Sequence, residues 1–257
     1  MASPRDTMDS MLIVANWKAY IEDAGRAKEL FQLAKRLARK EGVTIVLAPP
    51  APFLGTLSAG RPDRVALAAQ DLSATTGGAH TGESTAQAYA AAGASYAILG
   101  HSERRAMGET DTVIAEKVAH ALAHGLLPIL CVGETARDGE GQYLRFIREE
   151  LHTALAALTP KERATVVVAY EPIWAIGKTA ADAIDPADLN ETVLYIRKVL
   201  AELLPGKSAS RSRVLYGGSV EPGNARDLAA ASGVDGFLIG HASVEPTTFA
   251  ALIHNLA

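Results

Sequence analysis

Residue types that can support proton transfer directly follow short apolar runs of this sequence. Glu171 follows one run, and a carboxylate can act as a general base. His101 follows another run and can donate a proton, while Asn16 and Lys18 follow the first run and bring an amide donor and a positive charge. Together these types suit the removal of a proton beside a carbonyl group, because the oxyanion that forms needs donors already in place.

Two glycine-containing turns could bind an anion. Gly217 to Ser219 and Gly240-His241 each follow an apolar run near the end of the chain. Backbone N–H groups in such turns bind phosphate, and a short helix expected after Gly240 would point its positive N-terminal end at the same place. We therefore expect the substrate to be a phosphorylated metabolite.

The apolar runs alternate with longer segments whose apolar residues are spaced by three and four, which is typical of strands alternating with amphipathic helices. Most of the runs are almost entirely apolar, as in a parallel sheet that is covered on both faces. Strands are expected at Leu12 to Asn16, Val43 to Ala48, Val65 to Gln70, Tyr96 to Gly100, Leu127 to Val132, Thr165 to Tyr170, Arg213 to Tyr216 and Gly236 to Ile239. Helix starts are predicted at Thr159-Pro160 and Asp185-Pro186, and helix ends at Gly42, Gly93, Gly125 and Gly233.

Eight such units without a linker favour the α/β class and a single closed (β/α)8 TIM barrel over residues 1–257, with residues 1–10 as a flexible extension. An open, dinucleotide-binding sheet would instead place a glycine-rich loop after the first strand, where the sequence reads Asn16-Trp17-Lys18. In a barrel, the carboxyl ends of the strands surround one pocket. The residues that could do chemistry should therefore meet there.

A further segment, Pro172 to Thr179, follows Glu171 and is unusually apolar at its start. An apolar loop at the rim of a barrel suits a lid that excludes water from the pocket. The alternative is an ordinary loop that packs Trp174 on the barrel.

Composition argues against several classes of protein. The formal charge is −4, and Lys and Arg residues are scattered, so nucleic acid binding is not expected. No apolar run approaches the roughly 18 residues of a membrane-spanning helix, and we expect no membrane association. Cys131 is the only cysteine, which rules out an intrachain disulfide and favours a cytoplasmic location. No metal-ligand cluster or dinucleotide motif is present in the sequence, so no cofactor is expected.

Several segments resemble the signature segments of the triosephosphate isomerase family, in the same order along the chain. They are Asn16-Trp17-Lys18, Ile98 to Arg105, Tyr170 to Gly177 and Tyr216 to Val220, with Thr81-Gly82-Glu83 and Cys131 to Glu134 in addition. The resemblance implies a cofactor-free isomerase of glycolysis and gluconeogenesis that interconverts dihydroxyacetone phosphate and D-glyceraldehyde 3-phosphate through an enediolate.

The resemblance also implies a role for each site residue. Glu171 would be the base and His101 a neutral electrophile, while Lys18 would hold the developing negative charge and Asn16 would donate a hydrogen bond. Glu103 would pair with Lys18 or support the site from behind. Backbone N–H groups for the phosphate would come from Gly177, Ser219, Gly240 and His241.

A homodimer is predicted as well. The segment Asp71 to Glu83 is longer than a normal connection between strand and helix. The resemblance implies that this loop inserts beside the neighbouring subunit's active site, near that subunit's copy of Lys18.

Two places depart from the family pattern. Ala19-Tyr20 stand where many members have Met and Asn, a change expected to lie behind the site. His241 stands where a second glycine is usual. If position 241 requires a positive φ, His241 is strained there. If φ is negative, its N–H group remains available, and its ring either attracts phosphate when protonated or faces solvent without a role.

Two other functions stay open at this point. One is isomerisation of a related four-carbon ketose phosphate, for which the same base, electrophile and phosphate site would serve. The other is a non-catalytic phosphate-binding barrel, against which the presence of Lys18, His101 and Glu171 argues.

Overall fold

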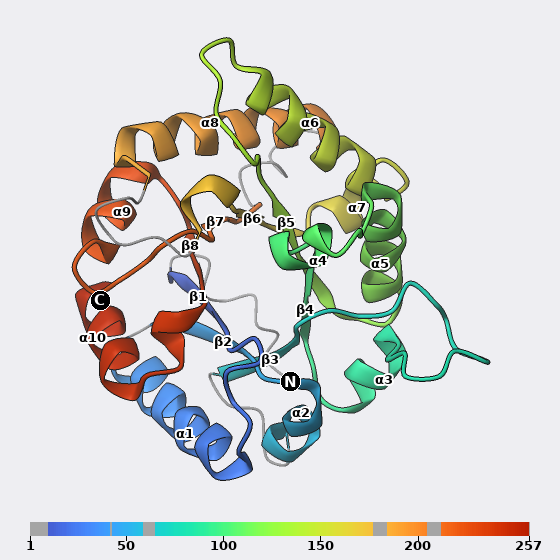
Figure 1. Cartoon of the computed structure of the whole chain (residues 1–257), viewed down its shortest axis with the longest axis vertical. Coiled ribbons are helices and arrows are strands. Elements are labelled where there is room, and N and C mark those ends of the chain that lie inside the picture. Colours follow the sequence, from blue (N-terminus) through green and yellow to red (C-terminus); the bar gives the residue numbers. More distant parts are fainter. Residues whose placement is uncertain (1–9, 42, 59–64, 177–183, 205–211, 257) are drawn as a thin grey trace.

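The eight strands of this computed structural model form a closed, parallel barrel in the order of the sequence (Figure 1). The structure describes residues 10–41, 43–58, 65–176, 184–204 and 212–256. The strands are β1 (Leu12–Asn16), β2 (Thr44–Ala48), β3 (Val65–Ala69), β4 (Tyr96–Leu99), β5 (Leu127–Val132), β6 (Val167–Tyr170), β7 (Val214–Tyr216) and β8 (Gly236–Ile239). The predicted (β/α)8 barrel is confirmed, and the open dinucleotide-binding sheet is wrong.

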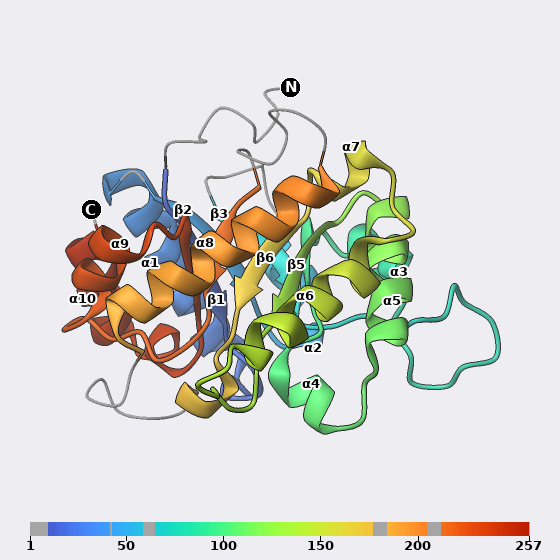
Figure 2. The same ribbon diagram turned by 90° about the horizontal axis from the view of Figure 1, so that it is seen from above.

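Helices surround the barrel and connect successive strands (Figures 1 and 2). They are α1 (Ala24–Glu41), α2 (Ala51–Ser58), α3 (Ala86–Ala91), α4 (Ser102–Ala106), α5 (Asp111–Ala123), α6 (Gln142–Leu155), α7 (Pro160–Arg163), α8 (Pro186–Leu203), α9 (Ala225–Ser232) and α10 (Pro246–Leu256), with 3₁₀ turns η2 (Ile173–Ala175) and η5 (His241–Ser243). Within the described ranges, no helix has both the length and the apolar character needed to cross a membrane.

Alternate residues of each strand face opposite sides, which creates two apolar layers. One layer fills the barrel and contains Val14, Ala169 and Leu238, among others. The other layer packs the strands against the helices and contains Ile13 and Val168. The inward-facing positions at the strand ends continue to Asn16, Glu171 and Gly240, so the strand pattern itself directs these residues toward the mouth of the barrel.

Helix boundaries agree with the capping residues of the sequence. The Thr159 hydroxyl accepts a hydrogen bond from the backbone N–H of Glu162, whose carboxylate in turn accepts one from the N–H of Thr159. Asp185 caps α8 through the N–H of Ala187. Gly233 ends α9 with φ +69°, while Gly42 lies outside the described residues.

Several expectations about segment ends differ from the structure or fall outside it. Four strands are one residue shorter than predicted: β2 and β7 begin at Thr44 and Val214, and β3 and β4 end at Ala69 and Leu99. The sixth strand begins at Val167 rather than Thr165, because the N–H groups of Thr165 and Val166 donate back to carbonyls of α7. The short helix expected after Gly240 is the 3₁₀ turn η5, which begins at His241. The expected flexible extension lies outside the described residues except for Ser10, whose hydroxyl oxygen is 2.8 Å from that of Thr44.

Candidate active site

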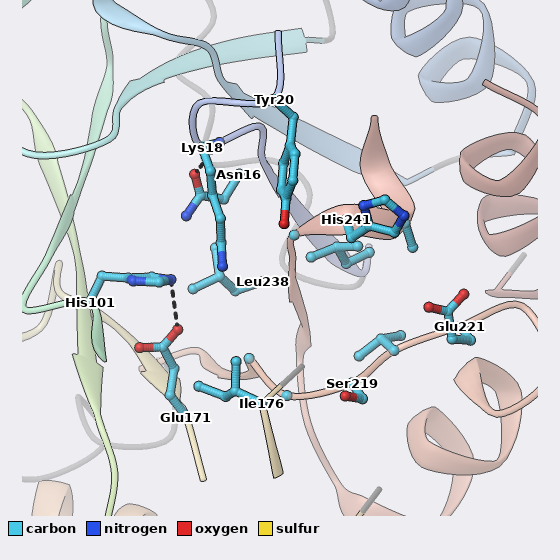
Figure 3. Close-up of a pocket in the computed structure, with 16 residues that line it drawn as sticks. Asn16, Lys18, Tyr20, His101, Glu171, Ile176, Ser219, Glu221, Leu238 and His241 are labelled. Carbon is cyan, nitrogen blue, oxygen red and sulfur yellow. Dashed lines mark hydrogen bonds and ion pairs between the residues drawn. The ribbon is translucent and has the colours of Figure 1, made fainter. Parts of the chain in front are cut away.

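A pocket of about 300 Å³ opens at the carboxyl ends of the strands (Figure 3). Of the residues predicted for the site, it is lined by Asn16, Lys18, His101, Glu171, Ser219, Gly240 and His241. His101 and Glu171 lie at one end of the pocket and Ser219 and His241 at the other, with Lys18 between them (Figure 3). The two ends are called here the reacting end and the anion end.

Glu171 and His101 are paired at the reacting end. Glu171 Oε1 is 3.1 Å from His101 Nε2, and the two residues are only 3% and 6% exposed. Glu171 Oε2 accepts a hydrogen bond of 2.9 Å from the N–H of Ser102, the first residue of α4. A buried carboxylate with two donors is held in one orientation.

The backbone fixes which nitrogen of His101 carries the proton. The N–H of Glu103 donates to His101 Nδ1 at 3.2 Å, so His101 caps the N-terminus of α4 with its ring. Because a backbone N–H can only donate, Nδ1 must be an unprotonated acceptor. The ring is then the neutral tautomer, with its proton on Nε2 and directed toward Glu171.

Glycine residues allow other segments to approach Glu171 closely. A Cβ atom at Gly133 would lie 1.9 Å from the carbonyl oxygen of Glu171, and one at Gly217 would lie 2.9 Å from its Cγ. Any other residue type at Gly133 would therefore displace the backbone that holds the carboxylate.

Lys18 has a strained backbone conformation that its neighbours support. Its φ is +46°, and no other non-glycine residue in the part of the chain described here has a positive φ. The N–H of Lys18 donates to the side chain of Asn16 at 3.1 Å, and the side chain of Gln70 donates to the Lys18 carbonyl at 2.8 Å. The N–H of Tyr20 closes the turn by donating to the carbonyl of Trp17.

Glu103 lies beside the pocket rather than in its lining. Its carboxylate accepts a hydrogen bond of 2.7 Å from Lys18 Nζ, and its side chain is 60% exposed. Of the two predicted alternatives for Glu103, the structure shows the ion pair with Lys18. An exposed pair of this kind adds little stability, so its contribution is the position of the ammonium group.

At the anion end, the turns after β7 and β8 face each other across the pocket. The Ser219 hydroxyl donates to the carbonyl of Ala175, and Gly240 lies close enough to Lys18 that an added Cβ would be 3.4 Å from Lys18 Cε. Gly177, the fourth residue predicted to bind phosphate, lies outside the described residues, as do Lys178 and Thr179 of the predicted lid.

His241 does not have a positive φ, so the strained alternative for this position is wrong. The residue begins the 3₁₀ turn η5, in which the N–H of Val244 donates to the carbonyl of His241. As the first residue of this turn, His241 has an N–H group without a partner inside the turn.

Tyr20 was expected to lie behind the site, and this expectation is wrong. Its ring lines the pocket and contacts the ring of His241 edge to face, with centroids 5.4 Å apart. The sequence gives no sign of this contact, because Tyr20 and His241 lie near opposite ends of the chain.

Glu134 is a buried residue near the site for which the sequence predicted no role. Its Oε1 accepts hydrogen bonds of 2.8 Å from both the Tyr170 hydroxyl and the Trp174 indole. Burial, followed by the Glu134 charge, raises the pKa of Tyr170, which therefore stays a donor. The start of the predicted lid is thus held against the barrel through Trp174. In the sequence, the only indication of a role for Glu134 was its place in the segment Cys131 to Glu134, which resembles the family pattern.

No group of three or more His, Cys, Asp and Glu side chains is arranged to hold a metal ion within the described ranges. Cys131 is fully buried inside the barrel, and burial raises the pKa of its thiol well above the usual value.

Comparison with known proteins identifies the family of this chain. A family model described as triosephosphate isomerase matches residues 11–256. A triosephosphate isomerase of Symbiobacterium thermophilum is 42% identical over 95% of this chain and 96% of its own length. The enzyme of Roseiflexus sp. is 41% identical over 97% of this chain and 98% of its own length. That of Coprinopsis cinerea is 38% identical over 92% of this chain and 94% of its own length. The chain belongs to the triosephosphate isomerase family.

Proposed function

We propose that this chain interconverts dihydroxyacetone phosphate and D-glyceraldehyde 3-phosphate, with Glu171 as the base and His101 as the proton donor to the substrate oxygens. The observation that carries the proposal is the buried pairing of Glu171 Oε1 with a neutral His101 Nε2–H at 3.1 Å, inside the pocket of a chain of this family.

The reaction is a proton transfer between neighbouring carbons. The Glu171 carboxylate removes a proton from the carbon beside the substrate carbonyl, and the electron pair of the broken C–H bond forms the enediolate. His101 Nε2–H donates to the oxygen on which negative charge develops. Glu171 then returns its proton to the adjacent carbon, while His101 transfers a proton between the two oxygens.

Substrate binding must replace the contact between the two side chains. In the free protein, the Nε2–H group of His101 points at Glu171 rather than at a ligand. A carbonyl oxygen that takes the place of Glu171 Oε1 would accept this hydrogen bond and leave the carboxylate free to act as a base. The neutral ring suits the task, since a donor that carried a full charge would form an ion pair with Glu171 instead.

Lys18 and Asn16 provide the remaining donors near the reacting end. Lys18 Nζ lies beside Gly240 and is held by Glu103, which places a positive charge between the reacting carbons and the anion end. A charge that is already in position stabilises the enediolate without the cost of reorganisation.

The phosphate would lie at the anion end. Backbone N–H groups of Ser219, Gly240 and His241 are the proposed donors, and the family resemblance adds Gly177. The negative φ of His241 supports its inclusion, because the amide can then be used without strain.

We also propose a homodimer through the Asp71 to Glu83 loop and a cytoplasmic location. The loop extends away from the barrel between β3 and α3 (Figure 2), and residues 77–84 are exposed in the single chain. The location rests on Cys131, a buried free thiol that needs no oxidising compartment.

A coupled assay tests the function. Purified protein receives dihydroxyacetone phosphate, and a dehydrogenase reports the glyceraldehyde 3-phosphate that forms. We expect turnover by the wild-type protein and a loss of at least about a thousandfold in Glu171→Gln, which keeps the shape of the side chain but removes its basicity. Absence of turnover by well-folded wild-type protein, or equal turnover by Glu171→Gln, would contradict the proposal.

A further inference from the structure

The rings of Tyr20 and His241 form an edge-to-face pair on one side of the pocket (Figure 3). Their centroids are 5.4 Å apart with an interplanar angle of 69°, the geometry in which the positive edge of one ring meets the negative face of the other. Both residues line the pocket, and Tyr20 lies between Lys18 and His241, which is at the anion end. The pair is therefore part of the wall that a bound substrate would meet.

Hydrogen-bonded turns hold the backbone from which each ring projects. Tyr20 closes the turn that contains the positive-φ residue Lys18, through its N–H bond to Trp17. His241 begins η5, whose Ser243 N–H and hydroxyl both donate to the carbonyl of Gly240, at 2.9 and 2.6 Å. Since β1 and β8 are paired neighbours in the barrel, the two turns cannot separate without disturbing the sheet.

The contact depends on two residues that depart from the family pattern. Asparagine at position 20 has no ring, and glycine at position 241 has no side chain. A chain with those residues would leave the space on this side of the pocket open. The paired rings are thus a feature of this chain, and they lie in the lining of the pocket.

We propose that Tyr20 and His241 together form a specificity-determining wall that favours a three-carbon over a four-carbon sugar phosphate. The inference rests on the proposed function. Glu171 and His101 fix the reacting carbons at one end, and the amides at the anion end fix the phosphate. One additional carbon moves the phosphate away from the reacting carbons by up to about 1.5 Å, the length of a carbon–carbon bond. Because His241 lies at the anion end, the longer ligand would press against the paired rings.

The test compares kcat/KM for dihydroxyacetone phosphate and for D-erythrulose 4-phosphate, a ketose with one more carbon and the same reacting group. The variants are Tyr20→Ala, His241→Ala and the double variant. Alanine suits position 241 because its φ is not positive, and it keeps the backbone N–H group. We expect each single variant to lower the preference for three carbons about tenfold, the scale on which a pocket discriminates one methylene group.

The double variant distinguishes a joint wall from two independent contacts. If the rings act as a pair, removal of either one opens the wall, and the double variant should show nearly the same preference as each single variant. Tyr20→Phe keeps the ring and should keep the preference. Phe146→Ala, which removes an exposed aromatic ring on α6, serves as the matched control and should leave the preference unchanged.

The outcomes separate this inference from the proposed function. If wild-type protein converts dihydroxyacetone phosphate but the ratio of the two kcat/KM values is the same in all variants, the wall is disproved and the function stands. Equal use of both substrates by wild-type protein would overturn the inference in the same way. Absence of turnover with either substrate would disprove the function itself. Circular dichroism and thermal melts of each variant confirm that the ratios come from folded protein.

Discussion

The Nε2 atom of His101 lies 3.1 Å from Oε1 of Glu171, while its Nδ1 atom accepts the N–H of Glu103. One imidazole thus links the start of α4 to the carboxylate after β6. The contact with Glu103 fixes the tautomer, and the contact with Glu171 shows that the Nε2 proton lies where a substrate oxygen would replace the carboxylate. A donor that is oriented before the substrate arrives costs little reorganisation during the reaction.

Replacing His101 by glutamine should lower kcat by about a hundredfold to a thousandfold. The glutamine amide can donate to a carbonyl oxygen, but it cannot transfer a proton between the two substrate oxygens. Binding of a phosphate-bearing inhibitor should change much less, because the phosphate donors lie at the other end of the pocket. Steady-state kinetics and inhibition constants of wild-type and His101→Gln protein check this. A loss confined to inhibitor binding would argue against His101 as the proton donor.

Glu150 supports the site from α6 and provides a prediction about stability. It is 1% exposed, its Oε2 accepts the N–H of Gly133 at 2.9 Å, and its Oε1 lies 3.1 Å from Arg105 Nη1. Burial raises the pKa of Glu150 to about 8, in spite of the opposing effects of Arg105 and the Gly133 N–H. Gly133 is also the residue whose missing Cβ allows the backbone of Glu171 to approach.

This raised pKa predicts that the free energy of unfolding falls as the pH rises. Between the ordinary pKa of a glutamate and about 8, the folded state retains a proton on Glu150 that the unfolded state has lost. Glu150→Gln cannot ionise and keeps an acceptor for Gly133. We expect Glu150→Gln to remove part of the decrease in the free energy of unfolding between pH 5 and 7.5. The part removed is at most about 1.4 kcal/mol per pH unit. Urea unfolding at several pH values measures this, with exposed Glu149→Gln as the control; equal slopes in Glu150→Gln and wild-type protein would contradict it.

The Asp71 to Glu83 loop should mediate a homodimer. Thr81→Arg would bring an unpaired charge into the expected interface, and burial of such a charge is costly. We expect wild-type protein to sediment at twice its 27.0 kDa chain mass and to lose activity on dilution. Thr81→Arg should dissociate at a concentration at least about tenfold higher. Thr153→Arg, at an exposed position on α6, is the matched control. A fully active wild-type monomer at assay concentration would refute the dimer.

The sequence was sufficient to predict the barrel and the residues at its rim. Strand periodicity gave β1, β5 and β8 with their observed limits, and Thr159 and Asp185 cap helices as expected. These features depend on local pattern and on a general rule for barrels, that polar residues at carboxyl strand ends meet in one pocket. The positions of Asn16, His101 and Glu171 in one pocket followed from that rule.

Other features of the site depend on contacts between segments that are far apart in the sequence. The positive φ of Lys18 is supported by Gln70, and the ring of Tyr20 contacts that of His241 edge to face at the pocket. Glu134 binds Trp174 and Tyr170 from a neighbouring strand end. A single sequence gives residue types at these positions but not the pairings, which require the three-dimensional arrangement.

The role of Glu171 as the base is the central claim, and shortening its side chain tests it most directly. Glu171→Asp keeps the carboxylate but withdraws it from the substrate carbon by about 1 Å, a misplacement that can cost about a hundredfold in rate. The measurement is kcat with dihydroxyacetone phosphate, together with the inhibition constant of a phosphate-bearing analogue, for wild-type and Glu171→Asp protein. We predict that kcat falls about a hundredfold or more while the inhibition constant stays nearly constant. An unchanged kcat in folded Glu171→Asp protein would contradict the account.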